Sequence, residues 1–227
     1  MMQNKFDIIG FVLNNLSIIT KDANILDLIK ISTIKAGYSF RQKIPELKNS
    51  GIYFVQMKDI NETYSITWNT VTEITLPNRQ SLLSLQSGDI LFAARGLRNY
   101  AALVDDELKD RYAIAAPQFF VIRLNFPDVL PEYLAWFLNQ TIAQRHFLKN
   151  AEGSNSKTPS IRRQVLEATP IILPSLKQQK NIIGISKIIT KEKQLATKMI
   201  ANGELLMQTL LNEISQTQLN EEEVPSC

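Results

Sequence analysis

Several residues that could bind nucleic acid follow a short apolar run near the middle of the chain. They lie in the segment LQSGDILFAARGLRNY, residues 85–100. Arg95 and Arg98 can each form two parallel hydrogen bonds to guanine. Asn99 can do the same to adenine, and Tyr100 adds an aromatic ring. Gly96 gives the backbone freedom to turn between the two arginines. This combination is typical of a segment that reads DNA bases, but an ordinary core strand between two loops would have the same pattern.

Two further regions have the chemistry to contact DNA phosphates. Arg41 and Lys43 follow Tyr38 and Phe40, so that a strand here would carry basic and aromatic side chains together. Residues 152–159 form a polar loop that leads into a predicted short helix, where phosphate is readily bound. The candidates in this second region are Ser154, Asn155, Lys157, Thr158, Arg162 and Arg163. A half-buried strand and a solvated surface loop are the alternative interpretations.

The motifs of the common enzyme classes are missing from the sequence. There is no dinucleotide fingerprint, no P-loop, no metal-ligand pair, no nucleophile elbow and no Pro-Pro pair of the kind found in amine methyltransferases. The fragments 46–48 and 107–109 match the Glu-x-Lys of carboxylate nucleases, but three residues recur by chance. His146 is the single histidine. We therefore expect no catalysis, no metal and no cofactor in this chain.

Composition is that of a globular protein with a mild basic bias. Of the 227 residues, 44% are hydrophobic and 21% are charged, so a packed core can form. The formal net charge of +3 permits a polyanionic partner without demanding one. The single cysteine, Cys227, favours a reducing compartment. With no signal peptide and no apolar run long enough for a membrane span, we expect a cytoplasmic protein.

Strands are expected in the first half of the chain and helices from Pro131 onward. Apolar, aromatic and β-branched runs bounded by turn residues predict strands over 51–57, 64–76, 90–94 and 119–124. Apolar residues at helical spacing predict one helix from Pro131 to about Asn150. Ser160 is the expected N-cap of a short helix. The proline-bounded segment 169–174 would then close the domain.

The last part of the chain has the pattern of a long helix. No proline occurs between Pro174 and Pro225, and apolar residues recur at intervals of three and four. The predicted seam consists of Ile182, Ile185, Ile189, Met199, Leu206 and Leu210. A helix of about 40 residues would be about 60 Å long, too long to bury this stripe on its own domain. We expect a domain over 1–174, a helical spacer over 175–219 that pairs with another helix, and a flexible acidic tail over 220–227.

The order of these features resembles the specificity (S) subunits of type I restriction-modification systems. Five stretches carry the resemblance over most of the chain: GYSFR at 37–41, GIYFVQMKDI at 51–60, LQSGDIL at 85–91, LPEYL at 130–134, and 153–166 running into IILPSLKQQ at 171–179. Each stretch alone is weakly specific. Together, in this order and followed by a long helix, they are much more so.

The resemblance implies an α/β (α+β) target-recognition domain followed by a long C-terminal α-helix that forms an antiparallel coiled coil. In that family each domain reads half of a bipartite DNA site, and the S subunit itself performs no chemistry. It places methyltransferase subunits, which bind S-adenosylmethionine, and motor-nuclease subunits on the site. This chain has one domain and one helix, so it looks like a half-length S subunit that would pair as a homodimer.

Two other classes of function remain open from the sequence. The chain could be a scaffold or interaction protein that uses its long helix and never reads DNA, or a stand-alone DNA-binding regulator. A neighbouring methyltransferase gene would favour the specificity-subunit interpretation over both.

Overall fold

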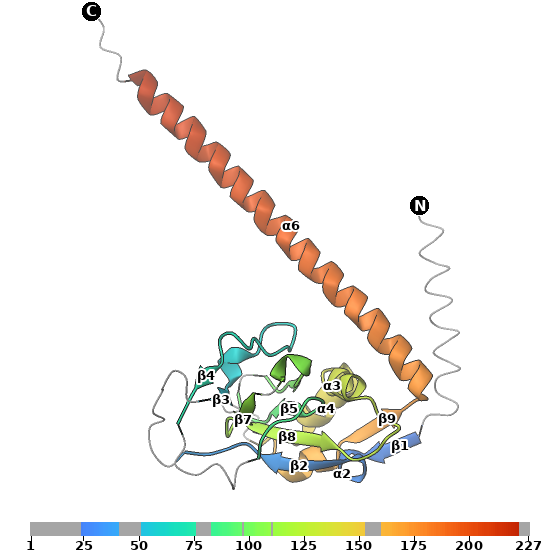
Figure 1. The fold of residues 1–227 in the computed structure, drawn as a ribbon. Coiled ribbons are helices and arrows are strands. Elements are labelled where there is room, and N and C mark those ends of the chain that lie inside the picture. Colours follow the sequence, from blue (N-terminus) through green and yellow to red (C-terminus); the bar gives the residue numbers. More distant parts are fainter. Residues whose placement is uncertain are drawn as a thin grey trace, which may run out of the picture. The chain divides into compact units, whose positions relative to one another are not determined.

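The computed structural model describes residues 24–40, 51–75, 83–96, 98–109, 111–152 and 160–222, with side chains described as far as residue 215. The strands are β1 (Asn24–Asp27), β2 (Ser32–Ala36), β3 (Ile52–Val55), β4 (Thr72–Glu73), β5 (Ile90–Ala93), β6 (Ala101–Leu103), β7 (Tyr112–Ala115), β8 (Phe119–Leu124) and β9 (Pro170–Leu173). The helices are α2 (Leu28–Ile31), η1 (Met57–Asp59), η2 (Asp106–Leu108), α3 (Pro131–Leu138), α4 (Thr141–Asn150), α5 (Arg163–Glu167) and α6 (Leu176–Glu222). This is the expected α+β domain followed by a long helix (Figure 1).

A four-stranded sheet in the order β2-β8-β5-β6 lies at the centre of the domain. Successive side chains of a strand point to opposite faces, and every residue of β5 is buried. Ile90 and Phe92 pack into a cluster with α2, α3, α4, α5 and β9. Leu91 and Ala93 pack on the other face, against β3 and β7 of the three-stranded sheet β4-β3-β7. The two apolar clusters therefore share this sheet.

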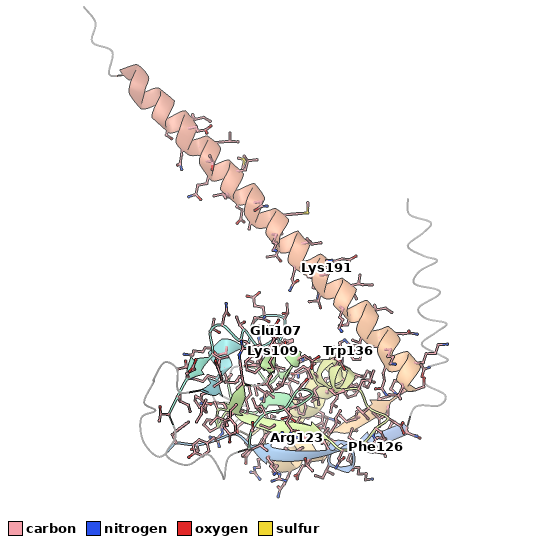
Figure 2. All side chains as sticks on the ribbon, viewed as in Figure 1. Glu107, Lys109, Arg123, Phe126, Trp136 and Lys191 are labelled. Carbon is pink, nitrogen blue, oxygen red and sulfur yellow. The ribbon has the colours of Figure 1, made fainter. Side chains whose placement is uncertain are left out.

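An ion pair between a buried carboxylate and a partly exposed arginine anchors the turn that precedes β5. The Asp89 side chain is 1% exposed and receives two hydrogen bonds from Arg123 of β8, Nε to Oδ1 at 2.7 Å and Nη2 to Oδ2 at 2.6 Å. The backbone N–H of Gln86 donates to the same carboxylate at 2.8 Å. Arg123 Nη2 also donates to the carbonyl of Ser84 at 3.0 Å. Figure 2 labels Arg123 on the strand that carries it. The SGD motif is thus a structural clamp between the turn and β8.

The single helix predicted from Pro131 to Asn150 is two helices, α3 and α4. Asn139 lies between them, and its side-chain amide forms hydrogen bonds with the backbone of β6, the edge strand of the central sheet. The N–H of Ala101 donates to Asn139 Oδ1 at 2.9 Å, and Asn139 Nδ2 donates to the carbonyls of Ala101 at 2.8 Å and Ala135 at 3.0 Å. Helical spacing of the apolar residues continues across the break, so the pattern alone does not reveal it.

The strand predicted over 64–76 is mostly loop, with only Thr72–Glu73 in β4. Two tight turns interrupt it. Tyr64 N–H donates to the carbonyl of Asn61, and Thr70 N–H donates to the carbonyl of Thr67, each at 3.0 Å. The β-branched residues of this stretch mostly lie in turns and not in paired strands. Strand propensity alone does not distinguish these two environments.

Helix α6 begins with a capping box and a buried glutamine. Ser175 N–H donates to Gln178 Oε1 at 3.0 Å, and Gln178 N–H donates to Ser175 Oγ at 3.4 Å. Gln179 is fully buried. Its Oε1 accepts from the N–H of Leu130 at 2.9 Å, and its Nε2 donates to the carbonyl of Asp128 at 2.8 Å. The first turn of the helix is therefore held by the domain.

The chain divides into two compact units, 1–183 and 184–227. The first turns of α6 belong to the first unit, and Ile182 is half-buried there against the cluster that contains the helices. In the second unit, side chains of α6 are exposed over 191–215 (Figure 2). At 1.5 Å per residue the 47-residue helix is about 70 Å long. Among the described residues, no helix combines the length and hydropathy needed to cross a bilayer.

Asp59 provides a pH-dependent contribution to stability. It is 1% exposed, accepts from the Gln56 N–H at 2.8 Å, and burial raises its pKa from 3.8 despite this bond. A raised folded pKa means that the folded state binds the proton more tightly, so stability falls as pH rises from the unfolded pKa through the folded one. Replacing Asp59 by asparagine removes this term and keeps an acceptor for Gln56. We expect the melting temperature of D59N, relative to the unaltered protein, to rise as pH increases from about 3.5 to 7. A difference independent of pH would contradict this assignment.

Candidate nucleic-acid interface

The segment after β5 lies beside the segment that precedes α5. Ile161 N–H donates to the carbonyl of Ala94 at 2.8 Å, and Arg95 forms an isolated antiparallel bridge with Ser160. Gly96 has φ of +139°, where a side chain would be strained, and a Cβ there would also crowd Met57. The backbone of Arg95 is thereby held in place by two neighbouring contacts.

Ser160 does not form the predicted N-cap. Helix α5 begins at Arg163 with Arg162 as its N-cap, and no side chain caps it. Ser160 instead exchanges two backbone hydrogen bonds with Glu152, at 3.0 and 3.1 Å. Glu152, the first residue of the predicted phosphate-binding loop 152–159, is therefore joined to Ser160, the residue that follows the loop, and Ser160 also pairs with Arg95. A three-segment arrangement of this kind depends on long-range pairing, which local capping rules do not anticipate.

Two of the predicted DNA-binding residues, Arg95 and Arg98, are exposed. Within the described residues, neither guanidinium group has a hydrogen bond or ion pair to another side chain. Two exposed cations that no described carboxylate neutralises are available to an external anion or acceptor.

Asn99 and Tyr100 are turned toward the protein. Asn99 Nδ2 donates to the carbonyl of Ala93 at 2.9 Å, which closes the turn after β5. The Tyr100 ring stacks on Tyr64, with centroids 5.5 Å apart, and meets the buried ring of Phe119 edge-on at 6.5 Å. Burial raises the pKa of Tyr100 to about 12, and the neighbouring Tyr64 adds to the shift. These two residues support the loop, and their polar groups are less accessible than the sequence suggests.

Arg162 and Arg163 each have a carboxylate partner. Arg162 forms an ion pair with Glu152, and Arg163 Nε donates to Glu167 Oε1 at 2.7 Å, one helical turn away. All four side chains are partly or largely exposed, so these pairs contribute little to stability. They lower the positive charge that this edge can offer to a phosphate.

The remaining predicted DNA contacts lie outside the described residues. They are Arg41, Lys43, Ser154, Asn155, Lys157 and Thr158.

Sequence reasoning missed Tyr64, which the fold places on Tyr100. The two residues are 36 positions apart, and their segments are brought together by an isolated bridge between Ser65 and Leu103 and by a hydrogen bond from Trp68 Nε1 to Asp105 Oδ1. The local signal was the turn-forming run Asn61-Glu62-Thr63 ahead of an aromatic residue. That signal indicates a loop with an aromatic tip but not its neighbour.

No group of three or more potential metal ligands occurs among the described histidine, cysteine and acidic residues. His146 contacts the carbonyl of Val165 through Nε2 at 3.2 Å. Glu107 and Lys109, the described acid and base of one Glu-x-Lys fragment, are labelled in Figure 2. The Glu107 N–H is bonded to Asp105 within a tight turn, and this is an ordinary capping arrangement.

Comparison with known proteins identifies the family. The model of the type I restriction modification DNA specificity domain matches residues 21–202. No curated protein sequence matches the chain. Three solved structures are similar in fold: the HsdS subunit from Thermoanaerobacter tengcongensis (21% identity, TM-score 0.59), a chain from a study of complex assembly and conformational transition of the type I R-M system (20%, 0.62), and a type I S subunit from M. genitalium (13%, 0.50).

The alignments cover 86%, 86% and 78% of this chain, but only 50%, 50% and 42% of the respective solved chains. The present sequence thus corresponds to about half of each. At these identities the structures establish the fold, and the family match rests on the specificity-domain model. Because that model spans most of the domain and the first part of α6, the chain belongs to the family of type I restriction modification DNA specificity domains.

Proposed function

We propose that this chain is a DNA-reading specificity subunit that directs a methyltransferase, or a methyltransferase and motor-nuclease complex, to a bipartite site. The observation that carries the proposal is the pair of exposed arginines, Arg95 and Arg98, on a specificity domain. Arginine is well suited to bidentate contact with guanine and to phosphate binding. The chain itself contributes recognition, and S-adenosylmethionine belongs to the partner methyltransferase.

The long helix supports pairing of two copies. Its exposed apolar side chains include Ile185, Ile189, Met199, Leu206 and Leu210. A row of positions at alternating intervals of three and four continues through Glu192, Ala196 and Gly203, as in a coiled-coil seam. A second copy running antiparallel would cover this row and carry a second recognition domain, which gives a reason for a bipartite site with inverted halves.

One antiparallel register places every member of this row from Ile185 to Leu210 against another member, whereas Ile182, the first residue of the predicted seam, is half-buried against its own domain. Its layers are Ile185 with Leu210, Ile189 with Leu206, Glu192 with Gly203, and Ala196 with Met199. Apart from its chain neighbours and the adjacent helix backbone, no described group lies within 4 Å of the position that a Cβ would take on Gly203, so the partner's Glu192 would find space there. Glu192 and Gly203, which interrupt the apolar seam, therefore complement each other in size. The layers Ile185–Leu210 and Ile189–Leu206 pair two large residues, and the layer Ala196–Met199 pairs a small residue with a large one.

The apolar surface of α6 is wider than one seam. Ile188, Leu195, Ile200, Met207 and Ile214 are also exposed, on either side of the row. A two-stranded coiled coil covers mainly the row itself. The flanking surface supports the proposal that the methyltransferase docks on the paired helices.

Selection of the purified protein against a random duplex library at low salt tests the proposed function. Two inverted half-sites at a fixed gap are the expected result. An isolated half-site would support DNA reading and contradict the pairing. If no sequence is enriched, even with the cognate methyltransferase present, the chain does not read DNA and the scaffold function is favoured.

Replacing Arg95 or Arg98 by alanine should separate base reading from phosphate binding. We expect R95A to lose about 1–3 kcal/mol of discrimination at one base pair, because its backbone is fixed by the Ser160 bridge. We expect R98A to weaken binding to all sequences and to reduce the slope of log K against log salt by about one unit. Lys30→Ala, an exposed cation on α2, is the charge control and should change neither quantity. Unchanged preference in R95A, or an unchanged slope in R98A, would refute the respective role.

A further inference from the structure

A tight loop presents the Tyr64 ring at the surface. Asn61 Oδ1 accepts hydrogen bonds from the N–H groups of Thr63 at 2.9 Å and Ser65 at 3.0 Å, and from the Thr63 hydroxyl at 2.7 Å. The loop closes where Asn61 N–H donates to the Ser65 carbonyl at 3.0 Å. The polar side chains at these positions are thus occupied in holding the turn, and the residue at its tip is Tyr64.

The conformation of Tyr64 is costly for the residue type. Its φ is +60°, a region that a residue with a bulky side chain rarely occupies, and the residue is 39% exposed. A glycine or asparagine would form the same turn with less strain, whereas tyrosine adds a ring that stacks on Tyr100 and still has an exposed part. Strain of this kind persists where the side chain has a use in that place.

The ring rests on a rigid support. Tyr64 stacks on Tyr100, with an interplanar angle of 21°, and Tyr100 meets Phe119, which is 1% exposed in the core. The aromatic column thus runs from the surface to the central sheet. Arg98 is only two residues from Tyr100 in the sequence. Tyr100, on which the Tyr64 ring stacks, therefore belongs to the same segment as the exposed arginines.

The loop 61–65 contains no cation that could pair with a phosphate. Tyr64 could offer a phosphate only its hydroxyl group, and the adjacent Glu62 is an exposed carboxylate that would repel a phosphate group. In an intact duplex the base faces are stacked, and the apolar group that a ring can reach is the C5 methyl of thymine in the major groove. The loop can therefore contribute an apolar contact to a base edge.

We propose that Tyr64 is a specificity-determining residue that packs against a thymine methyl group, next to the base pair read from the Arg95 segment. The inference rests on the proposed DNA-reading function. It adds to that function an aromatic residue from the loop 61–65, in contrast to the charged Arg95 and Arg98 of the segment after β5. Its contribution is apolar, in contrast to the charged arginines. It selects a base and leaves the electrostatic part of the affinity unchanged.

The test compares Y64N with Y64F in the library selection and in titrations of the selected duplex. Asparagine tolerates positive φ, so Y64N should fold, which thermal melting checks. Y64F keeps the ring and should select as the unaltered protein does. We expect Y64N to lose preference for thymine at one position, to bind the selected duplex about tenfold more weakly, and to keep the same salt slope.

Replacing that thymine by deoxyuridine, which lacks only the methyl group, completes a double-mutant cycle. The uracil duplex should bind the unaltered protein about tenfold more weakly and should have no further effect on Y64N. Additive losses would overturn the proposal, as would a Y64N protein that selects the same site with the same affinity or weakens on all sequences equally. If the unaltered protein enriches no sequence, the proposed function fails; if it enriches a site that Y64N reads equally well, only the role of Tyr64 fails. Ile25→Asn, an exposed apolar residue of β1, is the control and should have no effect.

Discussion

Replacing Arg123 by methionine is expected to lower the free energy of unfolding by about 3–5 kcal/mol. The substitution leaves the carboxylate of Asp89, 1% exposed, without its cation and with the Gln86 N–H as the remaining donor among its described hydrogen bonds. A buried charge without a partner is among the largest penalties that a single substitution can cause. Denaturant unfolding followed by circular dichroism measures the loss.

Two variants separate the buried charge from other effects of R123M. In D89N/R123M the charge is gone while the amide oxygen introduced at position 89 can still accept from the Gln86 N–H, so most of the lost stability should return. Arg145→Met removes an exposed arginine of α4 and should change stability by no more than about 0.5 kcal/mol. If the double variant is as unstable as R123M, the loss comes from packing of the arginine side chain and the ion-pair interpretation is wrong.

Replacing Leu206 by glutamate should separate the proposed dimer into monomers. Two copies of this charge would be buried against apolar side chains of the seam, at a cost of several kcal/mol. The affinity for a bipartite site should then fall about 10²–10⁴-fold, because the second half-site is no longer tethered. Leu205→Glu is the matched control, since Leu205 is similarly exposed, 65% against 60%, but lies about 100° further round the helix. Sedimentation and DNA titration are the measurements; equal dimerisation of both variants would contradict the seam.

Cysteine cross-linking determines the orientation of the helices in that dimer. In a Cys227→Ser background, the pair Ile189→Cys and Leu206→Cys should yield a covalent dimer on mild oxidation if the helices are antiparallel in the proposed register. Within one chain the two positions are about 25 Å apart, too far for a disulfide. Each single variant should remain monomeric under denaturing conditions. Cross-linking by either single variant would instead indicate a parallel pair.

The elements with strong local patterns were predictable. The aromatic and β-branched runs at β3, β5 and β8 and the proline-free arm at α6 are formed as expected, because burial and periodicity reinforce each other there. The break between α3 and α4 was not predictable because it depends on hydrogen bonds between Asn139 and Ala101, which is 38 residues away in the sequence. The predicted N-cap at Ser160 is wrong for the same reason. The backbone of Ser160 pairs with that of Glu152 across a loop, and local capping patterns do not indicate such a partner.

The position and exposure of the candidate arginines at the end of β5 were predictable, whereas the contacts made by the neighbouring side chains were not, and DNA binding by these residues stays a prediction. Arg95 and Arg98 occupy the expected strand end and are exposed. Asn99 has the same chemistry in the sequence as a base reader, but its amide closes the turn onto Ala93. Tyr64 could not be associated with the site at all, since stacking on Tyr100 depends on the pairing of distant segments. Residue type indicates what a side chain can bind, whereas the fold decides whether it is already engaged.

The shared central sheet has a consequence for the cooperativity of unfolding. Adjacent residues of β5 belong to different apolar clusters, so one cluster cannot melt without withdrawing β5 from the other. The first unit should therefore unfold in a single transition, although it contains two cores. Backbone amides in the middle of β5 and β8 should exchange with solvent only through that global event. The segment that carries Arg95 thus begins at a strand whose local opening should be as rare as complete unfolding, which would keep the start of the segment in place for the proposed contact with DNA.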